Sequence, residues 1–87
     1  MLRIHRSENA EVVFTLSGQM DEEAVAELKT LMSSEPERHT IALDLKDLTL
    51  VDEDAVTFLV GCEANRVTLK NCPAYVREWI NAQRRES

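Results

Sequence analysis

Apolar and polar residues alternate along several segments of the chain, which is the pattern of strands with one buried face. The clearest case is the segment in which Val12, Phe14 and Leu16 fall on one side and polar or smaller residues fall on the other. Strands are predicted over residues 2–5, 12–17, 41–44 and 66–70. A polar run at residues 7–11 joins the first two, so we expect an antiparallel hairpin with a longer loop there.

Other segments repeat apolar residues every three or four positions, which predicts amphipathic helices. Helices are predicted over residues 21–34, over residues 52–63 and from residue 73 onward. Asp21 is a good N-cap for the first, and Pro73 suits the start of the last because the missing N–H has no helical partner there. Trp79 is in phase with Val76 and Ile80, so we predict a tryptophan buried in the core.

The resulting order β-β-α-β-α-β-α predicts an α/β domain. Right-handed crossovers after the second and third strands give a mixed sheet with the helices mainly on one face. The other face is then partly covered at best, which offers a route to a homodimer. The chain of 87 residues is short enough to be one domain, over residues 1–87.

The composition is that of an acidic globular protein, with 44% hydrophobic residues, 30% charged residues and a net charge of −6. This charge argues against unspecific binding to nucleic acid or to an anionic membrane and favours a basic partner surface. No signal-peptide pattern and no apolar run of roughly 20 residues is present, so we expect a cytoplasmic protein.

The two cysteines, Cys62 and Cys72, do not have the spacing of metal ligands. Cys62 is expected in the core. Cys72 precedes a helix start, where the helix dipole would lower the pKa of its thiol, and a reactive thiol is the minority interpretation. The sequence also lacks a readable nucleophile and base pair or a Gly-rich phosphate loop, so no catalysis and no cofactor or metal are expected.

The strand that begins at residue 41 leads into three consecutive acids, Asp52, Glu53 and Asp54, at the start of the second helix. Their plain structural role is an N-cap followed by two first-turn acids, each of which stabilises a helix by about 0.3–1 kcal/mol. The same cluster is also a place where the module can present charge to a partner, and both interpretations stay open.

These residues also resemble part of a known family, the STAS domains of bacterial anti-sigma-factor antagonists. The matching positions are Asp44, Leu45, Leu48, Val51 and Asp52, together with Gly18, Met20 and Asp21 before the first helix. In that family the loop usually reads Asp-Ser-Ser-Gly or Asp-Ser-Thr-Gly, so Glu53 and Asp54 stand where it has two hydroxyl residues. Its phosphorylatable serine aligns with Asp54, and regulation by phosphorylation at this position is not expected.

The resemblance implies a STAS-like fold and a non-catalytic regulatory module that works by partner switching. Its partner would be an anti-sigma factor or a related serine-kinase-type switch protein. The contact would be the loop at residues 52–54 with the exposed flank of the following helix. Phosphorylation adds about −1.5 to −2 charges, and two carboxylates supply a comparable charge permanently, so this loop is interpreted as locked in a phosphate-like state.

Val56 and Val60 fall beside the main apolar stripe of the second helix, one turn apart. If both are exposed, they form an apolar spot next to the acids and belong to the partner surface. If a neighbouring helix covers them, they belong to a wide buried arc, and we hold the two interpretations equal. The alternative function is a small-ligand sensor that uses the crevice above the strand ends.

Overall fold

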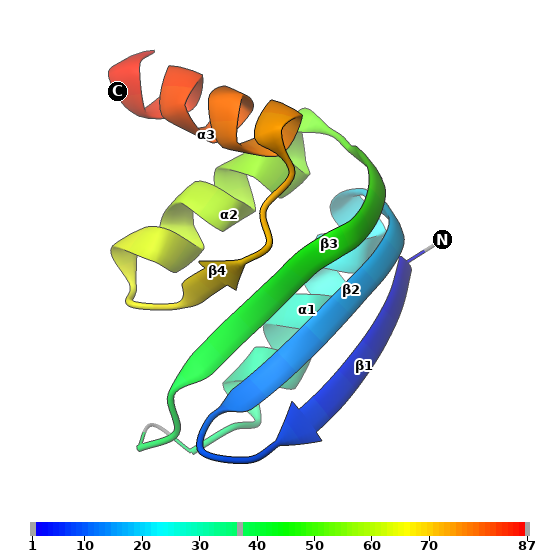
Figure 1. Ribbon diagram of the computed structural model, residues 1–87, viewed down its shortest axis with the longest axis vertical. Helices are drawn as coiled ribbons and strands as arrows, with labels where there is room; N and C mark the ends of the chain where they lie inside the picture. The colour runs from blue at the N-terminus through cyan, green and yellow to red at the C-terminus, as the bar shows by residue number, and fades with distance from the viewer. Residues whose placement is uncertain (1, 37, 87) are drawn as a thin grey trace.

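A four-stranded sheet organises the molecule, with the strands in the order β1-β2-β3-β4. The computed structural model describes residues 2–36 and 38–86. The elements are β1 (Leu2–Glu8), β2 (Val12–Met20), α1 (Glu22–Ser33), β3 (Ile41–Val51), α2 (Glu53–Ala64), β4 (Thr68–Lys70) and α3 (Ala74–Glu86). β1 runs antiparallel to β2, whereas β2, β3 and β4 are parallel, so the predicted order and the mixed sheet are confirmed (Figure 1).

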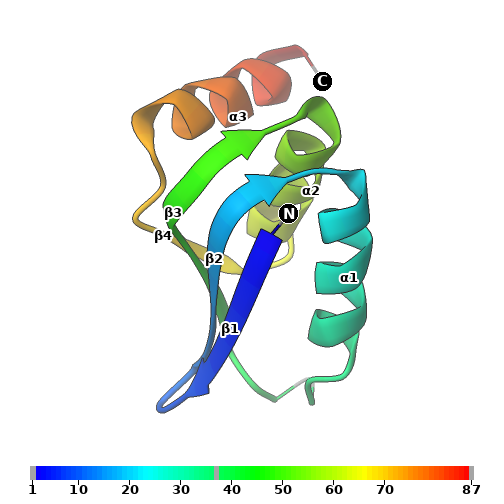
Figure 2. The ribbon, with the colours of Figure 1, turned by 90° about the vertical axis from the view of Figure 1, so that its right-hand side faces the viewer.

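The helices leave one face of the sheet open. Figure 2 shows α1 and α2 on the same side of the sheet and α3 beside α2, toward the end at which β3 finishes. The alternating residues of β2 that face the helices, Val12, Phe14 and Leu16, are buried as predicted. On the other face, the row of aligned residues formed by His5, Thr15, Asp44 and Lys70 is polar, whereas the row formed by Ser7, Val13, Ala42 and Thr68 is mixed. The homodimer stays a prediction.

β3 is longer than its alternating pattern predicts. Leu45, Leu48 and Val51 stay buried beyond residue 44, and register shifts against β2 occur on either side of the pair formed by Gly18 and Leu48. Each shift changes which residue of β3 faces the core, so strict alternation ends although the strand continues. The strand therefore reaches the start of α2 without an intervening loop.

The turn after α2 delays the start of the next strand. Arg66 has the left-handed backbone, with φ of 67°, whereas Asn65 has φ of −104°. Asn65 is held in place because its side-chain amide donates to the carbonyl oxygen of Gly61 at 2.8 Å. β4 begins only at Thr68 as a result, two residues later than predicted.

α3 docks through a narrow stripe that does not include its tryptophan. Val76 and Ile80 are fully buried, but 37% of Trp79 remains exposed. Trp79 lies about 100° around the helix from Ile80, which turns it toward the rim of the contact. The prediction of a core tryptophan is therefore wrong, while the predicted docking of the last helix is confirmed.

Candidate functional site

Two helices begin side by side at one edge of the sheet. β2 leads into α1 and the neighbouring parallel strand β3 leads into α2, so both helix starts lie at the same end (Figure 1). The backbone N–H of Asp52 donates to the carbonyl oxygen of Met20 at 3.3 Å, which ties the two junctions together. The topology of two adjacent parallel strands therefore brings residues that are 32 positions apart in the sequence, Met20 and Asp52, to one place.

The two helix starts are built alike. Asp21 accepts a hydrogen bond from the backbone N–H of Ala24 at 2.9 Å, and Asp52 accepts one from Ala55 at the same distance. Both caps have an extended backbone, as N-caps do. The structural role predicted for Asp52 is confirmed, since its carboxylate satisfies a helix N–H that would otherwise have no partner.

Together the helix starts form a cluster of carboxylates that we call the acidic edge. It consists of Asp21, Glu22 and Glu23 at α1 and Asp52, Glu53 and Asp54 at α2. Within residues 2–36 and 38–86, no basic side chain forms an ion pair with any of the six. The N–H ends of the two helices stabilise these charges. The acidic edge is thus a concentration of negative charge that is available to a partner.

Glu53 and Asp54 differ from Asp52 in what they do for the fold. Both side chains are exposed, and neither accepts a hydrogen bond from another described residue, whereas the Asp52 carboxylate is used by the cap. Their contribution to the helix is only the favourable interaction with its dipole. These two carboxylates are therefore free to meet groups from outside the molecule.

Val56 is not part of an exposed surface. Its side chain is fully buried, and Val60 is half-buried against the core. Both lie on the side of α2 that faces α3, where the Thr57 hydroxyl donates to Oε1 of Gln83 at 3.1 Å. The interpretation of Val56 as a partner-binding residue is therefore wrong, because a neighbouring helix covers it. A partner contact at Val60 stays a prediction.

The far end of α2 carries an acid that is used structurally. Both carboxylate oxygens of Glu63 accept from the Arg77 guanidinium, at 2.9 and 3.0 Å, and Arg84 donates to the same carboxylate at 2.8 Å. The hydrogen bonds from Arg77 lower the pKa of Glu63. Because this charge is neutralised by α3, the unpaired negative charge of α2 lies at its beginning.

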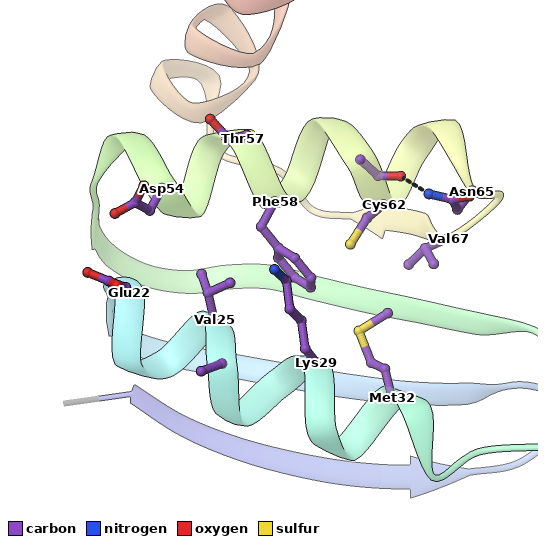
Figure 3. A pocket seen from close by; sticks show the side chains of 12 residues that line it. Glu22, Val25, Lys29, Met32, Asp54, Thr57, Phe58, Cys62, Asn65 and Val67 are labelled. Atoms are coloured by element: carbon purple, nitrogen blue, oxygen red, sulfur yellow. Dashed lines mark hydrogen bonds between the residues drawn. The ribbon is translucent and has the colours of Figure 1, made fainter.

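A groove of about 700 Å³ runs between α1 and α2, with one end at the acidic edge. Figure 3 shows Glu22 and Asp54 on opposite walls at that end, and Asn65 and Val67 at the other. Between them the lining is mainly apolar and comprises Val25, Ala26, Met32, Phe58, Gly61 and Cys62. Lys29 reaches across, with its Nζ 5.9 Å from the centre of the Phe58 ring. No pattern in the sequence predicted this groove, although a glycine inside a predicted helix was a signal for it.

Burial affects both cysteine thiols in the same direction. Burial raises the pKa of the Cys62 thiol to about 12, as suits the core residue that was predicted. Burial also raises the pKa of Cys72, partly offset by Arg77, so the lowering expected from the helix start is wrong. In the described part of the chain, no group of three or more His, Cys, Asp or Glu side chains is arranged to hold a metal ion. No helix among the described residues is long and apolar enough to cross a bilayer.

Solved structures share this arrangement of strands and helices. The structure of the anti-sigma factor antagonist SpoIIAA in its unphosphorylated form matches 93% of this chain and 82% of its own, with a TM-score of 0.65 and 20% identity. The chain folds as a STAS-like domain. An uncharacterised protein of the DUF3478 family from Shewanella loihica PV-4, described as having a SpoIIAA-like fold, also matches this STAS-like chain, with a TM-score of 0.53 and 13% identity over 77% of this chain and 61% of its own.

The same fold occurs inside a larger protein. The crystal structure of Mglu matches 83% of this chain with a TM-score of 0.58 and 18% identity, but the match covers only 19% of the Mglu chain. No family model and no curated protein sequence matches the chain. The matches to SpoIIAA and to the protein with a SpoIIAA-like fold confirm the STAS-like fold predicted from the sequence.

Proposed function

We propose that this protein is a non-catalytic, protein-binding regulatory module that acts by partner switching, as anti-sigma-factor antagonists do. The observation that carries the proposal is the pair of exposed carboxylates of Glu53 and Asp54 at the start of α2, neither of which forms an ion pair with another described residue. The sequence resemblance implies that Asp54 stands at the position of the phosphorylatable serine, and the likeness to the SpoIIAA fold supports the proposal. The partner is an anti-sigma factor or a related serine-kinase-type switch protein, and the complex forms in the cytoplasm.

Permanent charge at this position changes what regulates the module. A phosphoserine would carry about −1.5 to −2 charges, and the two carboxylates supply a similar charge without a kinase. The loop is therefore locked in a phosphate-like state. Which partner binds then depends on these two fixed residues and not on a kinase. Charge complementarity favours a partner that presents arginine or lysine to the acidic edge.

Calorimetric titration against the serine-kinase-type anti-sigma factors and switch proteins of the host tests this proposal. Glu53→Gln combined with Asp54→Asn removes two charges with little change of shape. It should weaken binding by at least about tenfold, which corresponds to about 1.4 kcal/mol. The matched control, Glu27→Gln with Glu78→Gln, removes two exposed acids elsewhere and should leave the affinity within about twofold at moderate salt. Equal losses in both variants, or no binding by any of these partners, would overturn the proposal.

The loop should also be inert to a serine kinase. Neither Glu53 nor Asp54 has a hydroxyl group, so incubation with a kinase of this class and ATP should leave the intact mass unchanged at residues 52–55. The variant Glu53→Ser with Asp54→Ser restores hydroxyl groups and should gain one phosphate, about 80 Da. Phosphate mapped to this segment of the unmodified protein would show that the acids are not a lock.

A small-ligand sensor is the second candidate, and the groove between α1 and α2 is the observation that favours it. Its volume lies in the range of small-molecule sites, and its walls are mainly apolar with a few polar groups. The groove differs from the crevice expected from the sequence, because it lies between two helices and only its acidic end reaches the strand ends (Figure 3).

A further inference from the structure

The groove between α1 and α2 is open at Gly61, a residue that makes α2 less stable than another residue would. Gly61 lies inside α2, and an added Cβ there would meet no heavy atom within 4 Å. Glycine in a helix interior costs about 0.5–1 kcal/mol relative to alanine. Among the described residues, no neighbour lies so close that position 61 has to be a glycine. Ala26 on the facing helix also lines the groove and is small and exposed. The space is thus kept open without any benefit to the isolated domain.

The dimensions and lining of the groove suit another helix. α1 and α2 each have 12 residues, which corresponds to about 18 Å of helix length. Phe58, Met32 and Val67 are only partly buried and face the groove, so an occupant with an apolar stripe would complete their burial. A groove between two helices is a common binding site for an amphipathic helix, which inserts side chains at three and four residue spacings.

Charge decides the orientation of such a helix. Glu22 and Asp54 lie on opposite walls at one end, and neither forms an ion pair within the described part of the chain (Figure 3). Lys29 is the cation of the lining, and its ammonium lies near the Phe58 ring, away from that end. A basic group of the occupant therefore fits between Glu22 and Asp54. Basic residues are stabilised in the last turn of a helix, so this end receives the C-terminus of the occupant.

We propose that the groove between α1 and α2 binds an amphipathic helix of a partner protein, with arginine or lysine in its last turn held between Glu22 and Asp54. The bound helix runs antiparallel to α1 and α2, since both begin at the acidic end. This inference rests on the proposed protein-binding function and names a partner element for it. Gly61 then has a role, because the absent side chain lets the incoming helix approach α2 closely.

The probe is a synthetic helical peptide of about 14 residues, labelled with fluorescein, with leucines at three and four residue spacings and two arginines in its last turn. Fluorescence anisotropy measures its binding. Gly61→Leu puts a side chain into the groove and should weaken binding at least about tenfold. Gly61→Ala adds only one methyl group and should weaken binding by less than Gly61→Leu does, so the two variants form a graded series.

Two further measurements test charge and orientation. Glu22→Lys combined with Asp54→Lys should abolish binding of the arginine peptide and favour a peptide with glutamates in its last turn. A peptide of the same composition with the arginines in its first turn should bind at least about fivefold more weakly to the unmodified protein. Equal binding of the two peptides, or equal binding by the Gly61→Leu variant, overturns the proposal.

The remaining outcomes separate this proposal from the proposed function. If the switch proteins bind both the unmodified protein and the Gly61→Leu variant, and the peptide does not bind, the groove proposal fails alone. If the peptide binds as described and no switch protein binds, the proposed function fails alone. If dodecyltrimethylammonium binds in the groove and the peptide does not, the groove is a small-ligand site and the helix proposal is wrong. A rise in apparent mass to that of a dimer, lost in Gly61→Leu, would assign the groove to a second copy of this chain and would also overturn it.

Discussion

Gly61→Ala should stabilise the protein, although it touches nothing in the folded state. The added methyl group meets no heavy atom within 4 Å, so it creates no clash and buries little new surface. The gain comes from the helix itself, because alanine loses less backbone freedom on folding than glycine does. In a helix interior the difference is about 0.5–1 kcal/mol. For a domain of this size, that free energy raises the melting temperature by roughly 2–8 °C.

The chain contains a matched control, because it has only one other glycine. Gly18 has φ of 99°, a backbone conformation that side chains disfavour, so Gly18→Ala should destabilise the protein by about 1 kcal/mol or more. Urea unfolding followed by circular dichroism at 222 nm gives both differences. A stability of Gly61→Ala equal to or below that of the unmodified protein would refute the reasoning, since it would mean that the space beside Gly61 is filled or that α2 is irregular there.

Five other substitutions, in three separate tests, probe the packing of α2 and α3. Ile80→Ala should lower the free energy of unfolding in urea by about 2–5 kcal/mol because Ile80 is fully buried. Trp79→Ala should lower it by no more than about 2 kcal/mol, since removing the partly exposed ring leaves no closed cavity. A larger loss of stability for Trp79→Ala would contradict the position of Trp79 at the rim of the contact. Val56→Lys should prevent folding by placing an unpaired charge at a fully buried site. Val60→Lys should still give the circular dichroism spectrum of a folded protein, because Val60 is only half-buried. If both variants folded, or if neither did, the difference in burial between the two valines would be disproved. Glu63→Gln should lower stability at pH 7, and by less as the pH falls: the pKa of Glu63 is lowered in the folded state by Arg77, so its contribution is present above the ordinary value of about 4.3 and is lost as the pH falls through the lower folded value. A difference between variant and unmodified protein that stayed constant as the pH fell would assign the effect to packing.

The elements that the sequence predicts well are those that bury a single face. The alternation of Val12, Phe14 and Leu16 matches the side of β2 that α1 and α2 cover, and no tertiary information is needed to read it. The N-caps are equally local, because Asp21 and Asp52 each bond to an N–H only three residues further on. These features depend on short-range geometry, which the sequence carries directly.

α2 is harder to read because it is buried on two sides. Ala55 and Leu59 pack with the core of the sheet, while Val56 lies on the side that α3 covers, and all three are fully buried. A search for one apolar stripe leaves Val56 outside it and makes it look like a surface residue. The position of α3 depends on contacts between residues more than 20 positions apart, such as Thr57 with Gln83, which no local pattern reveals.

The two ends of α2 separate acids that serve the fold from acids that face outward. Glu63 is held by Arg77 and Arg84, so its charge is balanced within the molecule and fastens α3 to α2. Glu53 and Asp54 have no such partners among the described residues, and they lie close to the acids that begin α1. Like charges brought together at one edge repel one another, and the helix dipoles offset only part of this cost. The partner proposed above, with basic residues at the acidic edge and a helix in the groove that starts there, would offset the rest of this cost.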